Sequence, residues 1–331
     1  MKYRYLGGMQ VSQFALGTWH LPPSSKKDDS GIFYVDKEKS DKIFKKAVDL
    51  GINFFDTANT YHGTISETHL HPEHSGNAER ILGQYLKGGE RESYVVATKV
   101  RAEVALFPNG GGLSRKHISW QIKQSLSRLE LDYIDLYQIH WQDPNTPPAE
   151  TMSILNDLVH HGMVHYLGTS NHPPDSTVQM IDITREHGWE PFVSMQESYN
   201  ILDRDVEKDK IRIARDNNMA LLAYVPLAEG LLTGKYLTGV PSGSRAGYTE
   251  GFRRKIEKSL TQVKRISEIS KELQITPSQL ALAWLLRKQE EFGISIIPIL
   301  GATDEQHLES NVEALNIRIP NDAYKQINEL G

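Results

Sequence analysis

Four polar side chains of different chemistry stand at the ends of three successive short apolar runs of the sequence. Asp56 and Tyr61 follow the second such run, Lys99 ends the third, and His140 ends the fourth. A free tyrosine has a pKa of about 10, so it is a poor acid or base at neutral pH. A neighbouring ammonium lowers that pKa, and a carboxylate keeps the ammonium charged and in place. Together these groups could orient a carbonyl oxygen, stabilise an oxyanion as hydride arrives at carbon, and then protonate it.

Each of these residues also has an ordinary structural explanation. Asp56 could begin a turn or cap a helix, and Lys99 could extend into solvent from a strand end. His140, which precedes Trp141, could be a hydrogen-bonded core histidine. Taken singly, these explanations are favoured, but packing alone rarely puts all four side chains at successive strand ends. We therefore interpret the four as catalytic residues, with Tyr61 as the proton donor.

The elements that would position these residues alternate along the chain. Helical periodicity is clearest after Ser114, and the run from Thr276 to Gln279 has the capping-box pattern of a helix start. Gly51 stands where a left-handed residue would end a helix. The strand-like apolar runs begin near Phe14, Ile52, Tyr94, Ile134, Val164, Phe192, Ala220 and Ile294.

Eight such units suit either a closed barrel or an open, doubly wound sheet. An open sheet that binds a dinucleotide would carry a GxGxxG turn after an early strand. No such motif follows either of the first two runs, and Gly110 to Gly112 has the wrong spacing. We therefore predict an α/β fold: a single-domain (β/α)8 TIM barrel over residues 1–331, with an N-terminal β-hairpin and long loops at the C-terminal face.

Two long segments interrupt the regular spacing, each after a strand. Residues 62–76 are polar and rich in histidine, and residues 225–255 are a long connection after the seventh strand. His69 and His71 form an HxH pair that resembles a metal site. Histidine in a polar loop is more often solvated, so we predict no metal and interpret the loop as part of the substrate pocket rim.

The bulk composition narrows the function classes. The chain has 331 residues, a formal net charge of −5 and no cysteine, which excludes disulfides and thiolate chemistry. Nucleic-acid binding is disfavoured because no basic stripe is present. No apolar run approaches the roughly 18 residues of a membrane span, and the N-terminus resembles no signal peptide. We expect a cytoplasmic protein; its oligomeric state stays open.

The sequence resembles the aldo-keto reductases along essentially its whole length. The resemblance rests on motifs in matching order and spacing: Tyr3–Gly7, Leu16–Trp19, Gly51–Tyr61, Ala97–Lys99, Leu136–His140, Tyr166–Asn171, Gln196–Asn200 and Val225–Tyr236. It implies NAD(P)H-dependent reduction of an aldehyde or ketone, with Asp56, Tyr61, Lys99 and His140 as the catalytic group and with Trp19, Tyr61, His140 and Trp141 around the substrate.

The resemblance also implies a cofactor site. It places Gly17, Thr18, Trp19 and Asp56 near the nicotinamide, Ser170, Asn171 and Gln196 on its carboxamide, and Tyr224 against its ring. Pro226, Leu227, Gly230, Lys235, Ser244 and Arg245 would fold over the pyrophosphate, and Gly301, Thr303, His307 and Asn311 would meet the adenosine end.

The adenosine end departs from the usual pattern of NADP-dependent members. Residues 301–311 contain no Arg or Lys, and Asp304 and Glu305 bring negative charge to the helix start. Thr303 and Gln306 have capping-box spacing. NADP is the expected cofactor on resemblance, and NAD stays open.

Two other functions stay open. A non-catalytic, nicotinamide-binding regulatory subunit has the same fold in the potassium-channel β subunits, although the full catalytic group here favours turnover. A metal-dependent hydrolase barrel built around His69 and His71 would need further ligands at later strand ends, where the chain has Ser170, Gln196 and Tyr224 instead.

Overall fold

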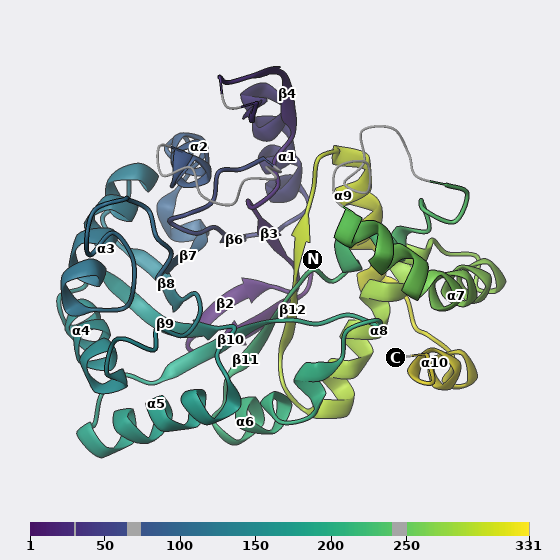
Figure 1. Cartoon of the computed structure of the whole chain (residues 1–331). Helices are drawn as coiled ribbons and strands as arrows, with labels where there is room; N and C mark the ends of the chain where they lie inside the picture. Colours follow the sequence, from purple (N-terminus) through teal and green to yellow (C-terminus); the bar gives the residue numbers. More distant parts are fainter. Residues whose placement is uncertain (30, 65–73, 240–249, 331) are drawn as a thin grey trace.

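The centre of the molecule is a closed barrel of parallel strands, seen in a computed structural model that describes residues 1–29, 31–64, 74–239 and 250–330. β12 closes the barrel by pairing with β3, with Gly301 beside Gly17. The predicted (β/α)8 fold is confirmed (Figure 1). Around the barrel the strands are β3 (Ala15–Gly17), β6 (Phe54–Asp56), β7 (Val95–Val100), β8 (Ile134–Ile139), β9 (Val164–Ser170), β10 (Phe192–Ser198), β11 (Ala220–Tyr224) and β12 (Ile296–Gly301).

Helices follow the barrel strands and cover the outside of the barrel (Figure 1). Four short 3₁₀ segments join the described helices: η2 (Arg91–Ser93), η3 (Asp205–Glu207), η4 (Ala228–Thr233) and η6 (Glu313–Asn316). The α-helices are α1 (Lys37–Asp49), α2 (Asn77–Leu86), α3 (Arg115–Leu129), α4 (Pro148–His160), α5 (Pro174–His187), α6 (Lys210–Asp216), α7 (Glu250–Glu272), α8 (Pro277–Phe292), α9 (Glu305–Val312) and α10 (Asn321–Asn328).

The local signals in the sequence position several of these helices. The Ser114 side chain caps α3, whose Ile118 and Ile122 are fully buried. Thr276 and Gln279 form the predicted capping box of α8. Gly51 has a φ of +84° just after α1, a conformation that glycine adopts without the strain a Cβ would cause. These three predictions are confirmed.

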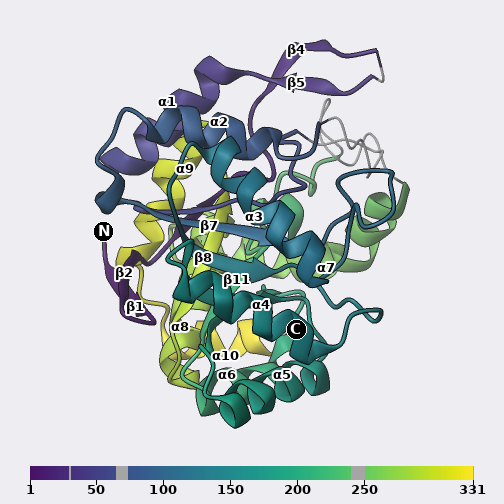
Figure 2. The same cartoon turned by 90° about the vertical axis from the view of Figure 1, so that its left-hand side faces the viewer.

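Two antiparallel hairpins flank the barrel. The predicted hairpin of β1 (Tyr3–Leu6) and β2 (Met9–Ser12) lies at the N-terminal end of the strands, where Ser12 N–H donates to Asn53 Oδ1 just before β6. A second hairpin of β4 (Pro23–Lys27) and β5 (Phe33–Val35) follows β3 and projects away from the barrel (Figure 2). The sequence analysis missed this second hairpin.

The connection after β11 is shorter than predicted. The expected segment, 225–255, contains η4 and the first turns of α7, which begins at Glu250. The described part of α7 buries Phe252 and Val263 on one face, so an apolar stripe helps to hold it on the barrel. None of the helices in the described ranges has the length and apolar content of a membrane span.

Candidate active site

The C-terminal ends of β6 and β7 bring three of the four predicted catalytic residues into direct contact. Lys99 is fully buried, and its Nζ lies 2.5 Å from Asp56 Oδ1 and 3.2 Å from the Tyr61 hydroxyl. It also donates to the carbonyl oxygen of Thr57 at 2.9 Å. The ammonium therefore has three acceptors and does not extend into solvent. Asp56 neither begins a turn nor caps a helix; its carboxylate is a buried ion-pair partner.

His140 completes this cluster from the end of β8. Its ring lies 5.7 Å from the Tyr61 ring in an edge-on arrangement and 4.3 Å from the Trp141 ring. Its Nδ1 is buried and has no hydrogen-bond partner among the described residues. A core histidine kept for structure would normally have that nitrogen paired, so its orphaned state fits a functional group.

The electrostatics of the cluster differ in one respect from the sequence-based expectation. Burial raises the pKa of Tyr61 above its usual value, and the opposing effect of Lys99 is too small to reverse this. Lys99 does lower this pKa, as expected, but the expected net fall is wrong, because desolvation of the phenolate outweighs the attraction. Tyr61 is therefore a neutral phenol with a proton to donate.

The other two titratable groups have complementary protonation states. Burial alone would lower the pKa of Lys99, but Asp56 and Tyr61 raise it above its usual value, so the ammonium stays charged. Burial, followed by Lys99 and Arg101, lowers the pKa of His140 well below its usual value. The site thus holds a neutral imidazole beside a neutral phenol and a charged amine.

The sequence analysis missed a second layer of contacts around Asp56. Gln138 Nε2 and Gln196 Nε2 donate to Asp56 Oδ2 at 3.2 and 2.9 Å, and Gln196 Nε2 also lies 3.2 Å from Gln138 Oε1. Gln138 stands two residues before His140 and shares its face of the strand. That alternation was the available signal for its place in the site.

The residues expected to hold the nicotinamide lie together at the ends of β9, β10 and β11. Asn171 Nδ2 donates to the His140 carbonyl oxygen at 3.1 Å and to Ser170 Oγ at 2.9 Å, and its Oδ1 accepts from the Tyr224 hydroxyl at 2.7 Å. Burial raises the pKa of Tyr224 to about 12, so its ring is a neutral surface. Gln196 Oε1 and the Ser170 hydroxyl hydrogen have no described partner.

The remaining residues expected near the nicotinamide and substrate lie around the same mouth. Thr18 is buried, and its hydroxyl donates to the Asp56 carbonyl oxygen at 3.2 Å. Gly17 lies beside Asp56 in the β3–β6 pairing. Trp19 is 45% exposed, and Trp141 is partly buried. Two indole rings thus flank the polar cluster.

The β11–α7 connection, expected over the pyrophosphate, begins in a strained conformation. Val225 has a φ of +52°, which is rare for a β-branched residue and marks a constrained position. Gly230 has a φ of +93°, a conformation that glycine adopts without strain, so this turn favours glycine here. Pro226 and Leu227 precede that turn, and Lys235 is exposed with its Nζ 5.1 Å from the Tyr236 ring. Ser244 and Arg245 lie outside the described residues.

The expected adenosine end corresponds to the start of α9. Asp304 is the N-cap, and its carboxylate accepts from the Gln306 and His307 backbone N–H groups. The capping-box prediction for Thr303 and Gln306 is wrong, because α9 begins one residue later and the Asp304 carboxylate accepts from both backbone donors. The His307 side chain is 83% exposed. Gly301 and Thr303 are exposed and Asn311 is buried.

The histidine-rich loop is described only at its edges. The His62 and His74 rings lie 4.6 Å apart, and His74 Nε2 lies 2.7 Å from Asp28 Oδ2. His69 and His71 lie outside the described residues. Among the residues that the structure does describe, no three His, Cys, Asp or Glu side chains are grouped to hold a metal ion.

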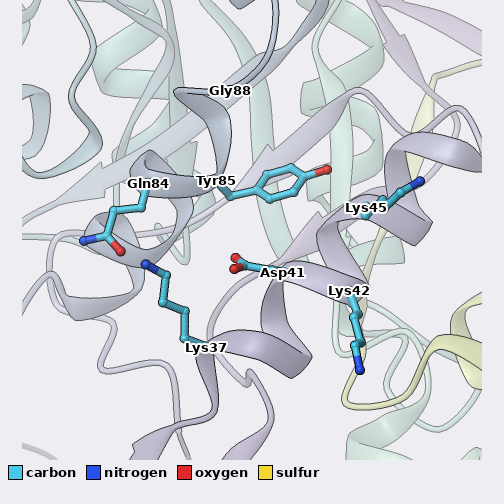
Figure 3. A pocket seen from close by; sticks show the side chains of 7 residues that line it. All are labelled: Lys37, Asp41, Lys42, Lys45, Gln84, Tyr85 and Gly88. Carbon is cyan, nitrogen blue, oxygen red and sulfur yellow. The ribbon is translucent and has the colours of Figure 1, made fainter.

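A separate pocket of about 500 Å³ lies between α1 and α2 (Figure 3). It shares no residue with the catalytic cluster, and we exclude it from the active site on position. Its lining consists of Lys37, Asp41, Lys42, Lys45, Gln84, Tyr85 and Gly88.

Comparisons with known proteins agree with this geometry. A model of the aldo/keto reductase family matches residues 13–331. The chain is 34% identical over 330 residues to L-glyceraldehyde 3-phosphate reductase of Escherichia coli (strain K12), covering 96% of this chain and 88% of that protein. It is 34% identical over 344 residues to a putative voltage-gated potassium channel subunit beta of Schizosaccharomyces pombe, with 99% and 92% covered. The crystal structure of a thermostable aldo-keto reductase with the inhibitor epalrestat matches with a TM-score of 0.74 and 28% identity, covering both chains fully.

Proposed function

Because the chain belongs to the aldo/keto reductase family, we propose that it reduces an aldehyde or ketone to an alcohol, with Tyr61 as the proton donor. The observation that carries the proposal is the buried contact of Lys99 with both Asp56 and Tyr61, beside the unpaired His140. Family and fold imply NAD(P)H-dependent oxidoreduction, and the cofactor, when bound, supplies the hydride.

Each residue of the cluster has a separate part in the proposed reaction. The neutral His140 imidazole orients the carbonyl oxygen toward the phenol. The Tyr61 hydroxyl gives its proton to that oxygen as negative charge develops on it, and Lys99 stabilises the resulting phenolate. Asp56 holds the ammonium in position and keeps it charged, while Gln138 keeps the carboxylate from turning away.

The ends of β9 to β11 fit a nicotinamide. A carboxamide needs both a donor and an acceptor, and the Ser170 hydroxyl and Gln196 Oε1 supply one of each. The neutral Tyr224 ring offers a flat surface beside them, and its hydroxyl is already bound to Asn171. We assign Pro226, Leu227, Gly230 and Lys235 to the pyrophosphate and the start of α9 to the adenosine end.

The finer parts of the proposal follow from the family and the composition. NADP is the expected cofactor, although the absence of Arg and Lys between 301 and 311 keeps NAD open. A cysteine-free enzyme with a nucleotide cofactor suits the cytoplasm, where we place it. We treat residues 1–331 as one domain. The name of the Escherichia coli relative indicates that a small phosphorylated aldehyde is one substrate to test.

A second function, that of a cofactor-binding regulatory subunit, has support from the name of the Schizosaccharomyces pombe relative. Steady-state NADPH oxidation with butanal, together with NADPH binding by fluorescence, separates the two functions. We expect turnover that requires both NADPH and aldehyde. Tight NADPH binding without turnover of any aldehyde or ketone in a broad panel would favour the regulatory subunit.

A further inference from the structure

Arg101 follows β7 two residues after Lys99 and has an unusual backbone conformation. Its φ is +137°, a region that residues with a side chain rarely adopt. The Gly112 N–H holds this conformation by donating to the Arg101 carbonyl oxygen at 2.8 Å. Strain of this kind persists where the surroundings enforce it, and it concentrates at ligand-binding positions.

The guanidinium lies on the same wall of the barrel mouth as the catalytic cluster. Arg101 Nε donates to the Gln142 carbonyl oxygen at 3.2 Å, and the guanidinium carbon lies 5.1 Å from the Trp141 ring. That ring lies 4.3 Å from the His140 ring, which in turn contacts Tyr61. Three contacts in series therefore connect the charge with the proposed proton donor.

The outer nitrogens of this guanidinium have no acceptor among the described residues. Two other partly buried arginines have carboxylate partners: Arg91 pairs with Asp135, and Arg128 pairs with Glu79. Arg101 is partly buried too, but its contacts with the described residues involve only Nε and the face of the group.

Asp143 is a carboxylate near enough to Arg101 for the guanidinium charge to help lower its pKa. Its Oδ2 accepts instead from the Leu113 N–H at 2.8 Å and the Thr146 hydroxyl at 2.7 Å, and its Oδ1 accepts from the Asn145 N–H. These donors, two from its own loop and one from the segment before α3, occupy the Asp143 carboxylate, so among the described residues it makes no hydrogen bond to the forked end of Arg101.

We propose that Arg101 binds an anionic group of the substrate, a carboxylate or a phosphate, so that the enzyme prefers aldehydes and ketones that carry such a group. A guanidinium whose Nε is tethered, and whose Nη groups have no acceptor in the described part of the chain, can hold two oxygens of one anion in a fixed plane. Trp141 lies between Arg101 and His140 and can contact the carbon chain that joins the anion to the carbonyl.

The local field agrees with this assignment. Burial, followed by Lys99 and Arg101, lowers the pKa of His140, so the positive charge of Arg101 reaches the place where the carbonyl would bind. Because the imidazole is neutral and Lys99 is paired with Asp56, Arg101 is the group next to Trp141, among the residues that the structure describes, whose positive charge can attract an anionic substrate.

The test compares pairs of substrates that differ in the anionic group, and it rests on the proposed function. The pairs are succinic semialdehyde against butanal, and glyceraldehyde 3-phosphate against glyceraldehyde, each as a ratio of kcat/KM values. Replacement Arg101→Gln should lower at least one ratio by about tenfold or more, since a charged, two-donor contact is lost. The affected pair identifies a carboxylate or a phosphate as the preferred group.

Two further variants make the result specific. Arg101→Lys should recover part of the lost ratio, because an ammonium keeps the charge but not the fork. Arg115→Gln is the matched control: Arg115 begins α3, is exposed and pairs with Asp157, so both ratios should match wild type. Unchanged ratios in Arg101→Gln, or the same change in Arg115→Gln, would overturn the proposal.

A binding measurement separates the failure of this proposal from failure of the proposed function. Calorimetry with NADP⁺ and the reduction product 4-hydroxybutyrate needs no turnover. Glycerol 3-phosphate against glycerol makes the same comparison for a phosphate. The Arg101→Gln protein should bind at least one of the two anions more weakly than wild type, by about tenfold or more, whereas 1-butanol and glycerol should bind both proteins alike. Equal affinity of the two proteins for both 4-hydroxybutyrate and glycerol 3-phosphate contradicts a role for Arg101 whether or not any aldehyde is reduced.

Discussion

At the scale of single residues, burial decides which groups of the active site carry charge. Tyr61 and His140 are both neutral because desolvation disfavours their charged forms, while Lys99 stays charged because Asp56 is its partner. A sequence shows the residue types and their order, and so the four residues could be predicted. It does not show how dry the site is, which is why the direction of the Tyr61 pKa shift was predicted wrongly.

The protonation states predict the pH dependence of carbonyl reduction. Tyr61 must be protonated to act as the donor, and burial raises its pKa, so turnover should fall only as pH rises past about 10. The pKa of His140 is lowered, so its protonation should cause no loss between pH about 6 and 8. A kcat profile at saturating substrate measures this. An apparent pKa near 7 that vanishes in His140→Gln would contradict the neutral imidazole.

Gln138 and Arg101 show what sequence reasoning about single residues leaves out. Gln138 is recognisable only once the strand register places it on the face of His140. Arg101 follows a strand whose catalytic residue had already been identified, and nothing in its neighbours marks the positive φ or the unpaired guanidinium. Both features are tertiary, so they come from the structure.

At the scale of elements, three barrel strands end in residues with positive φ. Arg101 follows β7, Asn171 follows β9 and Val225 follows β11, with φ values of +137°, +52° and +52°. A left-handed residue redirects the chain at once, so each strand end turns across the mouth of the barrel. Asn tolerates this conformation, whereas Val and Arg do not, and their neighbours must hold them there.

Asn200 holds the strained turn after β11 in place. Its buried Nδ2 donates to the Val225 carbonyl oxygen at 3.0 Å. We predict that Asn200→Ala weakens NADPH binding by about tenfold, because an unpaired carbonyl costs roughly 1–3 kcal/mol and the turn relaxes. Fluorescence titration measures the dissociation constant. Asn217→Ala, which removes a similar bond to the Ile213 carbonyl oxygen far from the mouth, is the control. An unchanged NADPH affinity in Asn200→Ala would remove this role.

The start of α9 bears on cofactor choice. Asp304 uses its carboxylate as the N-cap, yet its charge stays beside the proposed site of the 2′-phosphate, and His307 is exposed. We predict that any preference for NADPH over NADH is within about two orders of magnitude, or under about 3 kcal/mol. His307→Arg should strengthen NADPH binding selectively. Four dissociation constants, for two proteins with two cofactors, decide this. A much larger wild-type preference would mean that another cation reaches the phosphate.

At the scale of the whole molecule, the barrel brings residues that lie far apart in the sequence together in one site. Strand and helix periodicity repeats through the chain, so the eight strands and the N-terminal hairpin could be predicted. The β4–β5 hairpin could not be predicted, because Pro23–Lys27 is polar and shows no alternation of apolar and polar residues. Closure itself depends on the pairing of β12 with β3, nearly 300 residues apart, which no local pattern shows.

The most direct test of the account is the substitution Tyr61→Phe, which removes one oxygen from the centre of the catalytic cluster. The measurements are kcat for an aldehyde that wild type reduces, and the dissociation constant of NADPH for both proteins. We predict a fall in kcat of at least about 100-fold, in line with the loss of a general acid, and an NADPH affinity within about threefold of wild type. Turnover within a few-fold of wild type would contradict Tyr61 as the proton donor, and with it the proposed mechanism.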